Sequence, residues 1–415
     1  MTLLLRGFLG LTRVAPALPR HLAQRAHQRM GAAPERFPER LGRASLLRPE
    51  GRLIWVHAAS VGEVVAARDM ARDLAREAGA TLLFTTSSQG GAGAVPQGAL
   101  HQFAPIDTAH AVRGFLDHWR PDLGIFVEAD LWPRLVLGAK ARGVRLALAN
   151  ARASRTRRRA PQTIRALLSQ FDVVTAQDAA VERELRDLGI ARAEAVGDLR
   201  AAAEPPGADP ETLTTLAKAI GDRPVWAAVS THPADEGAVA SAHRAVMTAH
   251  RGALLLWAPR HPARAEAVAG TLEGLRVARR SLGASPNSNT DVLLVDTLGE
   301  TGLLFRLSPL TFLGGGYGPE GGHNPWEPAR LGSAVLSGPG VANHRDGFRK
   351  LTSAGAARIV ESGADLGPTV AGLLGSAELD RMRAAATRIA AEGSGARTRT
   401  LDLLHPLLAG AGQRA

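Results

Sequence analysis

The feature that most constrains the fold of this chain is an alternation of short apolar runs with helical patterns between residues 53 and 360. The runs are apolar throughout, which is typical of parallel strands covered by helices on both faces. In the first half we expect strands at Leu53–Ala59, Thr81–Thr86, Leu123–Glu128, Arg145–Asn150, Asp172–Gln177 and Ala193–Val196. In the second half we expect strands at Val225–Ser230, Ala253–Pro259, Asp291–Asp296, Leu310–Gly314, Ala334–Ser337 and Ala357–Val360. Helical patterns such as Val64–Ala78 and Val181–Leu188 lie between them.

A segment rich in Ala and Pro, residues 197–210, interrupts the alternation and indicates a linker. The chain has 415 residues, more than one hydrophobic core usually organises. We therefore predict an N-terminal segment over 1–50, a doubly wound α/β domain over 51–204 and a second over 205–415, whose last helices can pack back on the first. Ligands of such sheets bind beyond the carboxyl ends of the strands, so the turns after the strands are where to search.

The formal charge of +11 is concentrated in two arginine-rich segments. Residues 1–52 carry ten arginines against three glutamates, and residues 150–170 carry six arginines and no acid. The first segment is also apolar between Leu3 and Leu11, but it is too short and too charged to span a bilayer. We interpret it as an interfacial helix on anionic headgroups. A signal peptide and a helix packed on the protein itself are the alternatives.

Composition excludes several classes of protein and site. Aromatic residues make up 4% of the chain and no nucleic-acid motif accompanies the arginines, so we expect no nucleic-acid partner. The absence of cysteine excludes disulfides, thiolate metal sites and cysteine nucleophiles.

Three turns of the first half carry polar groups. Ser60 and Glu63 have the spacing of a helix capping box, and Glu63 is alternatively a general base held at a helix start. Glu128 and Asp130 follow a strand, where they can hold a divalent cation or cap the next helix. The arginines from Arg152 onward suit an acidic or phosphorylated substrate, unless they form a solvated helix face.

In the second half, Arg260 and His261 follow a strand, and Thr297 and Glu300 again have capping-box spacing. A glycine-rich loop over 314–322 leads to a predicted helix start with Asn324 as N-cap, Pro325 at N1 and Glu327 at N3, which is a potential phosphate site. The loop matches neither the P-loop nor the dinucleotide-binding glycine pattern. The residues therefore predict a two-domain nucleotide-type cleft enzyme, with an acid in the first half and a phosphate loop in the second.

Taken in order, seven segments resemble 3-deoxy-D-manno-octulosonic acid (Kdo) transferases of lipid A biosynthesis. They are Ser60–Glu63, Glu128–Pro133, Asn150–Arg152, Ser230–His232, Pro259–Pro262, Gly299–Glu300 and Gly322–Glu327. The resemblance implies a B-type glycosyltransferase fold, with two Rossmann-like doubly wound domains facing a central cleft. It implies inverting transfer of Kdo from CMP-Kdo to a phosphorylated lipid A precursor, without a metal or other cofactor. The first domain would bind the acceptor and the second the donor, at the anionic cytoplasmic face of the bacterial inner membrane, with the protein peripheral or monotopic.

The family's functional positions transfer to numbered residues of this chain. Glu63 matches the general base, and Glu128 matches an acid that supports the transition state. The positions that match CMP-binding residues are Arg260, His261, Leu298, Gly299, Glu300, Asn324, Pro325, Trp326 and Glu327. Arg200 stands where the family has lysine, and Asp130 stands where it has glutamate, so both are departures. The alternatives are a B-type transferase of another nucleotide sugar and a non-catalytic membrane-surface lipid-binding protein of the same fold.

Overall fold

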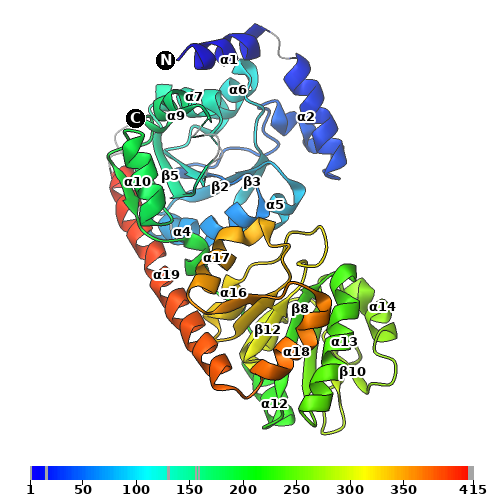
Figure 1. Cartoon of the computed structure of the whole chain (residues 1–415). Coiled ribbons are helices and arrows are strands. Elements are labelled where there is room, and N and C mark those ends of the chain that lie inside the picture. Colours follow the sequence, from blue (N-terminus) through cyan, green and yellow to red (C-terminus); the bar gives the residue numbers. More distant parts are fainter. Residues whose placement is uncertain (1, 15–16, 129–130, 155–156, 158, 410–415) are drawn as a thin grey trace. The chain divides into compact units, whose positions relative to one another are not determined.

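The computed structural model describes residues 2–14, 17–128, 131–154, 157 and 159–409. The chain divides into two compact units (Figure 1). Unit 1 comprises residues 1–203 together with 393–415, and unit 2 comprises residues 204–392.

Unit 1 is built on a seven-stranded, all-parallel sheet in the order β3-β2-β1-β4-β5-β6-β7. Its strands are β1 (Leu53–His57), β2 (Thr81–Thr86), β3 (Leu100–Phe103), β4 (Leu123–Val127), β5 (Arg145–Ala151), β6 (Val173–Ala176) and β7 (Ala193–Ala195). Its helices are α1 (Leu3–Val14), α2 (Ala17–Arg29), α3 (Phe37–Arg40), α4 (Val61–Ala78), α5 (Gln89–Gly93), α6 (Ala109–Trp119), α7 (Pro133–Ala141), α9 (Pro161–Leu168), α10 (Ala179–Asp187) and α11 (Leu199–Ala202).

Unit 2 repeats this plan with a parallel sheet in the order β10-β11-β9-β8-β12-β13-β14. Its strands are β8 (Val225–Thr231), β9 (Leu254–Pro259), β10 (Val277–Arg279), β11 (Val292–Leu294), β12 (Leu310–Leu313), β13 (Ala334–Ser337) and β14 (Ala357–Ile359). Its helices are α12 (Pro210–Ile220), α13 (Pro233–Ala249), α14 (Ala265–Gly270), α15 (Thr301–Leu307), α16 (Trp326–Arg330), α17 (Arg345–Ser353), α18 (Gly363–Leu373) and the first part of α19 (Ala377–Ala409), which continues into unit 1.

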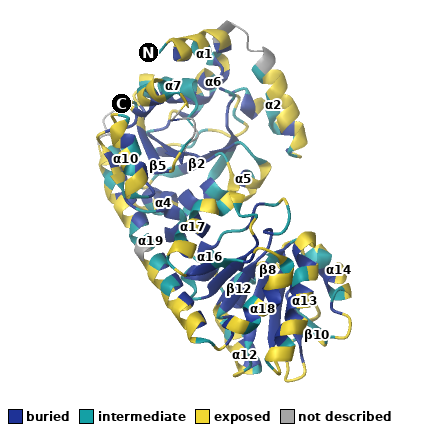
Figure 2. Cartoon of the chain, viewed as in Figure 1, coloured by how far each residue is buried: buried dark blue, intermediate teal, exposed yellow. Residues whose placement is uncertain are grey.

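All twelve predicted strands are present, with ends that differ by at most two residues. The sheets contain two further strands, β3 and β10, that the apolar pattern did not reveal. Both lie at sheet edges, where one side of the strand is unpaired and continuous burial is not required. The central strands are buried along almost their whole length (Figure 2).

The N-terminal helix α1 divides its surface between the protein and solvent. Leu5 and Thr12 are buried, and the Thr12 hydroxyl accepts a hydrogen bond from Arg134 Nε of α7 at 2.6 Å. Leu3, Leu4 and Leu11 are exposed, with 91% of the Leu3 surface open. The segment thus packs on the protein along one face and leaves an apolar face uncovered. Within the described ranges, no helix is both long and apolar enough to cross a membrane.

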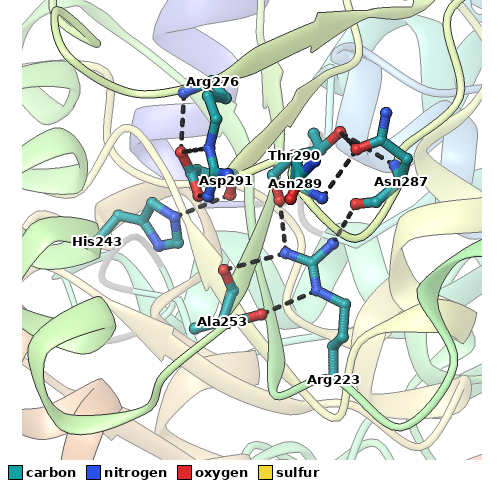
Figure 3. Close-up of polar contacts among 9 residues, drawn as sticks. Arg223, His243, Ala253, Arg276, Asn287, Asn289, Thr290 and Asp291 are labelled. Carbon is teal, nitrogen blue, oxygen red and sulfur yellow. Dashed lines mark hydrogen bonds and ion pairs between the residues drawn. The ribbon is translucent and has the colours of Figure 1, made fainter.

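The amino ends of β8, β9, β10 and β11 are tied together by a polar cluster (Figure 3). Arg223 donates to the carbonyl oxygens of Gly252, Ala253, Asn287 and Thr290. Arg276 pairs bidentately with Asp291, just before β11. His243 of α13 accepts from the Trp226 indole at Nδ1 and donates from Nε2 to the Asp291 carbonyl. Ligands of doubly wound sheets bind at the opposite, carboxyl end of the strands.

Candidate active site

The Ser60–Glu63 turn forms a helix cap, as its spacing predicts. The Ser60 hydroxyl accepts the Glu63 N–H at 3.4 Å at the start of α4. The Glu63 carboxylate reaches back to accept the N–H of Ala59 at 2.6 Å, one residue before the N-cap. Glu63 has 9% of its surface exposed. The cap therefore fixes a nearly buried carboxylate at the carboxyl end of β1.

Glu128 lies directly after β4 in the left-handed region, with a φ of 65°, and 1% of its surface is exposed. Its two oxygens pair with two arginines from different segments, Arg152 Nε at 2.8 Å and Arg200 Nη2 at 2.5 Å. Burial raises the pKa of Glu128 to about 7 against the pull of Arg200 and Arg152. The nearby Glu63 and Asp198 carboxylates add to the increase. A non-glycine residue in this conformation, buried and titrating near neutrality, is typical of a functional site.

Arg200 is positioned by a buried polar network. Asp198 caps α11 by accepting the Arg200 N–H, and it also accepts from Asn150 Nδ2 at 3.3 Å. Asn150, at φ 59°, accepts the Leu199 N–H at 2.9 Å. The guanidinium lies beside Gly62, where an added Cβ would be 3.4 Å from Nη2. Its buried Nε has no hydrogen-bond partner within the described part of the chain.

The cap proposed for Glu128 on the following helix is wrong. The N–H groups of Arg134 and Leu135 at the start of α7 donate instead to Asp107, from the loop after β3. Burial raises the pKa of Asp107 to about 6 despite these bonds. Asp130, the other half of the predicted cation pair, lies outside the described residues. Among the residues that are described, no three His, Asp or Glu side chains form a group able to hold a metal ion.

In unit 2 the glycine-rich loop after β12 passes close to its neighbours. A Cβ on Gly314 would lie 2.5 Å from the Ser230 carbonyl oxygen, and one on Gly316 would lie 2.6 Å from the Gly338 nitrogen. The loop is held by Asp235, which is fully buried in α13. Its carboxylate accepts the N–H groups of His232, Gly315 and Tyr317 at 2.8, 2.7 and 3.2 Å. One side chain thus fixes the loops after β8 and β12.

Arg260 and His261 follow β9 at the same end of the sheet, and both are exposed. The Arg260 N–H donates to the Thr231 carbonyl, which places its loop against the loop after β8. His261 packs edge-on against His232, and His232 stacks on His323. Cationic and imidazole groups from three loops therefore gather beyond the carboxyl ends of β8, β9 and β12.

The predicted capping role of Thr297 and Glu300 is wrong. Helix α15 begins at Thr301, and the Glu300 carboxylate accepts instead from the Thr297 hydroxyl and from Arg280. Burial acts to raise the pKa of Glu300, but the bonds from Arg280 and Thr297 outweigh it and hold the pKa below its usual value. Gly299 has a φ of 84°, and Leu298 is 80% exposed. The turn presents an apolar side chain to solvent beside an ionised carboxylate.

The helix predicted after the glycine-rich loop starts one residue late and is short. Helix α16 spans five residues, and Pro325 rather than Asn324 is its N-cap. Asn324 Oδ1 accepts the Trp326 N–H at 3.2 Å, while its amide donates to Glu327 at 3.3 Å. The Trp326 side chain is buried, so Asn324 and Glu327 are the groups of this segment with exposed surface.

Sequence reasoning missed Asp235 and the contact between His232 and His323. Asp235 lies three residues after His232, the N-cap of α13, which is the same capping spacing that singled out Glu63, so it could have been found. The contact between the two histidines joins positions 91 residues apart, and no local pattern reports it.

Comparison with known proteins identifies the family. A family model described as 3-deoxy-D-manno-octulosonic-acid transferase (kdotransferase) matches residues 35–203. A 3-deoxy-D-manno-octulosonic acid transferase of Haemophilus influenzae is 34% identical over 400 residues, covering 90% of this chain and 92% of its own. Its counterpart in Bordetella pertussis is 34% identical over 423 residues, covering 96% and 98%.

A solved glycosyltransferase from Rickettsia africae has the same fold at a TM-score of 0.55 and 12% identity, covering 87% of this chain and 100% of its own. In this chain that fold consists of two compact units, each with a parallel seven-stranded sheet. The extent and identity of the two transferase matches show that this chain belongs to the family of 3-deoxy-D-manno-octulosonic acid transferases, and is a glycosyltransferase with the B-type fold.

Proposed function

We propose that this protein transfers Kdo from CMP-Kdo to a phosphorylated lipid A precursor, with inversion at the anomeric carbon. The observation that carries the proposal is the arrangement of Glu63, Glu128 and Arg200 at the carboxyl end of the unit 1 sheet. It combines a carboxylate fixed at a helix start with a buried acid whose charge is balanced by arginine. A carboxylate so fixed is the group that proton abstraction from a sugar hydroxyl requires.

In this proposal Glu63 accepts the proton of the acceptor hydroxyl. The hydroxyl oxygen then bonds to the anomeric carbon of Kdo, and the bond from that carbon to the phosphate oxygen breaks. Its electron pair leaves with CMP, so the proton ends on Glu63 and the charge on the phosphate. Arg200 has a buried Nε without a hydrogen-bond partner in the described part of unit 1, and a guanidinium so placed can stabilise developing negative charge.

Unit 2 supplies the donor site in the same proposal. The loops after β8, β9 and β12 offer Arg260, His261 and close-packed glycine backbone to the phosphate. Leu298 presents an exposed apolar side chain for the cytosine ring. Glu300, Asn324 and Glu327 are partly exposed, and their polar groups suit the hydroxyls of the ribose. Gly299, Pro325 and Trp326 shape the backbone of these turns.

The decisive measurement is CMP release by the purified protein with CMP-Kdo and a tetraacylated lipid A precursor. We expect Glu63→Gln to lower kcat by about 10²- to 10⁴-fold, because an amide cannot take the proton. Glu211→Gln is the matched control, since Glu211 also lies in the first turn of a helix but is exposed. Full activity of Glu63→Gln would show that Glu63 is not the general base. Turnover only with another nucleotide sugar would show that CMP-Kdo is not the donor. Lipid binding without turnover on any donor would favour a non-catalytic lipid-binding protein.

We further propose that the protein is peripheral on the anionic cytoplasmic face of the inner membrane, through α1 and α2. The exposed Leu3, Leu4 and Leu11 supply apolar contact, and exposed arginines of α2, including Arg20 and Arg25, supply charge. Replacing the three leucines by serine leaves Leu5 and Thr12 to pack on the protein. We expect this triple variant to fail to float with anionic liposomes in a flotation assay. Leu282→Ser, at an exposed leucine of unit 2, is the control. Unchanged flotation of the triple variant would exclude this surface.

A further inference from the structure

Two histidines from different loops of unit 2 share a hydrogen bond. His232 follows β8, and His323 follows the glycine-rich loop after β12. Their Nε2 atoms are 3.0 Å apart, and their rings stack with centroids 5.2 Å apart at an interplanar angle of 8°. One Nε2 must carry a proton and the other must accept it, so the bond forms between two neutral rings, or between one neutral ring and one imidazolium. Two imidazolium rings would break it.

The groups around this pair decide its charge. His261 packs edge-on against His232 with centroids 5.9 Å apart, and Arg260 lies in the same loop. Glu320 Oε1 is 3.9 Å from His232 Nδ1, and the Asp235 carboxylate accepts the His232 backbone N–H. Burial, together with the charges of His232, Arg260 and His261, lowers the pKa of His323 to about 4. Without an anion, the His323 ring is therefore neutral at physiological pH.

We propose that the His232–His323 pair is a proton-accepting part of the phosphate site, and that it takes up one proton from solvent when the phosphate of CMP binds beyond β8, β9 and β12. The proposal rests on the proposed function, in which unit 2 holds the donor. The added proton makes one ring an imidazolium, and the hydrogen bond between the two Nε2 atoms is kept. When CMP leaves, the pair returns the proton to solvent.

The direction of this change follows from charge. One negative charge about 5 Å from an imidazole in partly buried surroundings raises its pKa by about 2, and a phosphate monoester carries nearly two charges. The His323 ring, neutral in the absence of phosphate, thus becomes cationic at neutral pH when a phosphate monoester binds. Arg260 cannot adjust in this way, because a guanidinium stays protonated. The pair adds a positive charge only when an anion is there to balance it.

The test is calorimetric titration of the full-length protein with CMP at pH 7.5, in buffers of different ionisation enthalpy. For the wild type we expect uptake approaching one proton per CMP bound. CMP affinity should fall by up to tenfold per pH unit between pH 7 and 8, where the phosphate of CMP is already ionised. His323→Gln and His232→Gln, each alone, should bring proton uptake close to zero and weaken CMP binding by about tenfold. His110→Gln, at an exposed histidine of α6, should behave as the wild type.

Two failures are distinguishable. CMP binding without proton uptake, or with undiminished uptake in both variants, overturns the role of the pair and leaves the donor assignment standing. Absence of CMP binding to the wild type overturns both. The binding heat of a variant reports that its site is folded. If one variant does not fold, the other variant and the pH dependence of the wild type decide.

Discussion

At the scale of single residues, Glu128 is the most unusual side chain of unit 1. It is buried, its backbone is left-handed, and each carboxylate oxygen faces a different arginine. Its pKa of about 7 is a balance between burial, which favours the neutral acid, and two cations, which favour the carboxylate. Any change to either arginine alters that balance, so the arginines can be tested through the pH dependence of the reaction.

We expect kcat/KM to fall as the pH drops through about 7, because protonation of Glu128 abolishes both ion pairs. Arg200→Ala should shift this fall in kcat/KM to higher pH by about 1 to 3 units, because the nearest charge that balances Glu128 is lost. Arg200→Lys should return most of the shift by restoring the charge. The measurement is the pH profile of CMP release.

Arg152→Ala is the internal comparison for that profile. The Arg152 side chain is 45% exposed, against 16% for Arg200, so solvent screens its charge more and its removal should shift the fall in kcat/KM less. A profile that is the same in wild type and Arg200→Ala would show that Glu128 is not the group that titrates.

At the scale of elements, the two loops of the donor site depend on one buried carboxylate in α13. Asp235 accepts three backbone N–H groups from the loops after β8 and β12. In Asp235→Asn one oxygen becomes an NH₂ group that faces an N–H donor. We expect a loss of about 1–3 kcal/mol in unfolding free energy and a rise in KM for CMP-Kdo larger than the fall in kcat.

Asp380→Asn is the matched control, because Asp380 also lies in the first turn of a helix but is exposed. Chemical denaturation and steady-state kinetics measure the two effects separately. An unchanged KM in a destabilised Asp235→Asn variant would show that the carboxylate supports the fold alone.

Sequence and structure agree best where a pattern is local. The central strands were predictable because burial on both faces demands continuous apolar residues, as in Leu53 to Val56 of β1. The edge strand Leu100–Phe103 was not, because its sequence, Leu-His-Gln-Phe, carries polar groups that an edge tolerates. At the site, the Glu63 cap was readable from spacing. The pairing of Glu128 with Arg200 was not, because it joins residues 72 positions apart through the fold.

At the scale of the whole molecule, the two units differ in the pKa shifts of their buried titratable groups. In unit 2, burial lowers the pKa of His243 and of His323 to about 4. In unit 1, burial raises the pKa of Glu128 to about 7 and of Asp107 to about 6, although it lowers that of His101 to about 4. Acidification therefore lowers the stability of unit 2 through both histidines. In unit 1 it acts in opposite directions on the two carboxyl groups and on His101.

We expect unit 2 to lose stability before unit 1 as the pH falls from 7 to 4.5. A histidine with a lowered folded-state pKa takes up its proton only on unfolding, so its stabilising effect is present above pH 6.5 and is lost as the pH falls toward 4. For His243, fully buried between Trp226 and Asp291, the loss by pH 4.5 is about 2.5 kcal/mol. Glu128 and Asp107 work the other way, because their folded states bind protons more tightly than the unfolded chain does.

Pulse proteolysis at pH 7 and pH 4.5, with the surviving fragments identified by mass, measures each unit separately. His243→Gln keeps a donor for the Asp291 carbonyl but does not titrate, so it should remove about 2.5 kcal/mol of the acid sensitivity of unit 2. Gln in place of the exposed His110 should leave that sensitivity unchanged. Equal acid sensitivity of both units, or no effect of His243→Gln, would show that other groups control the acid response.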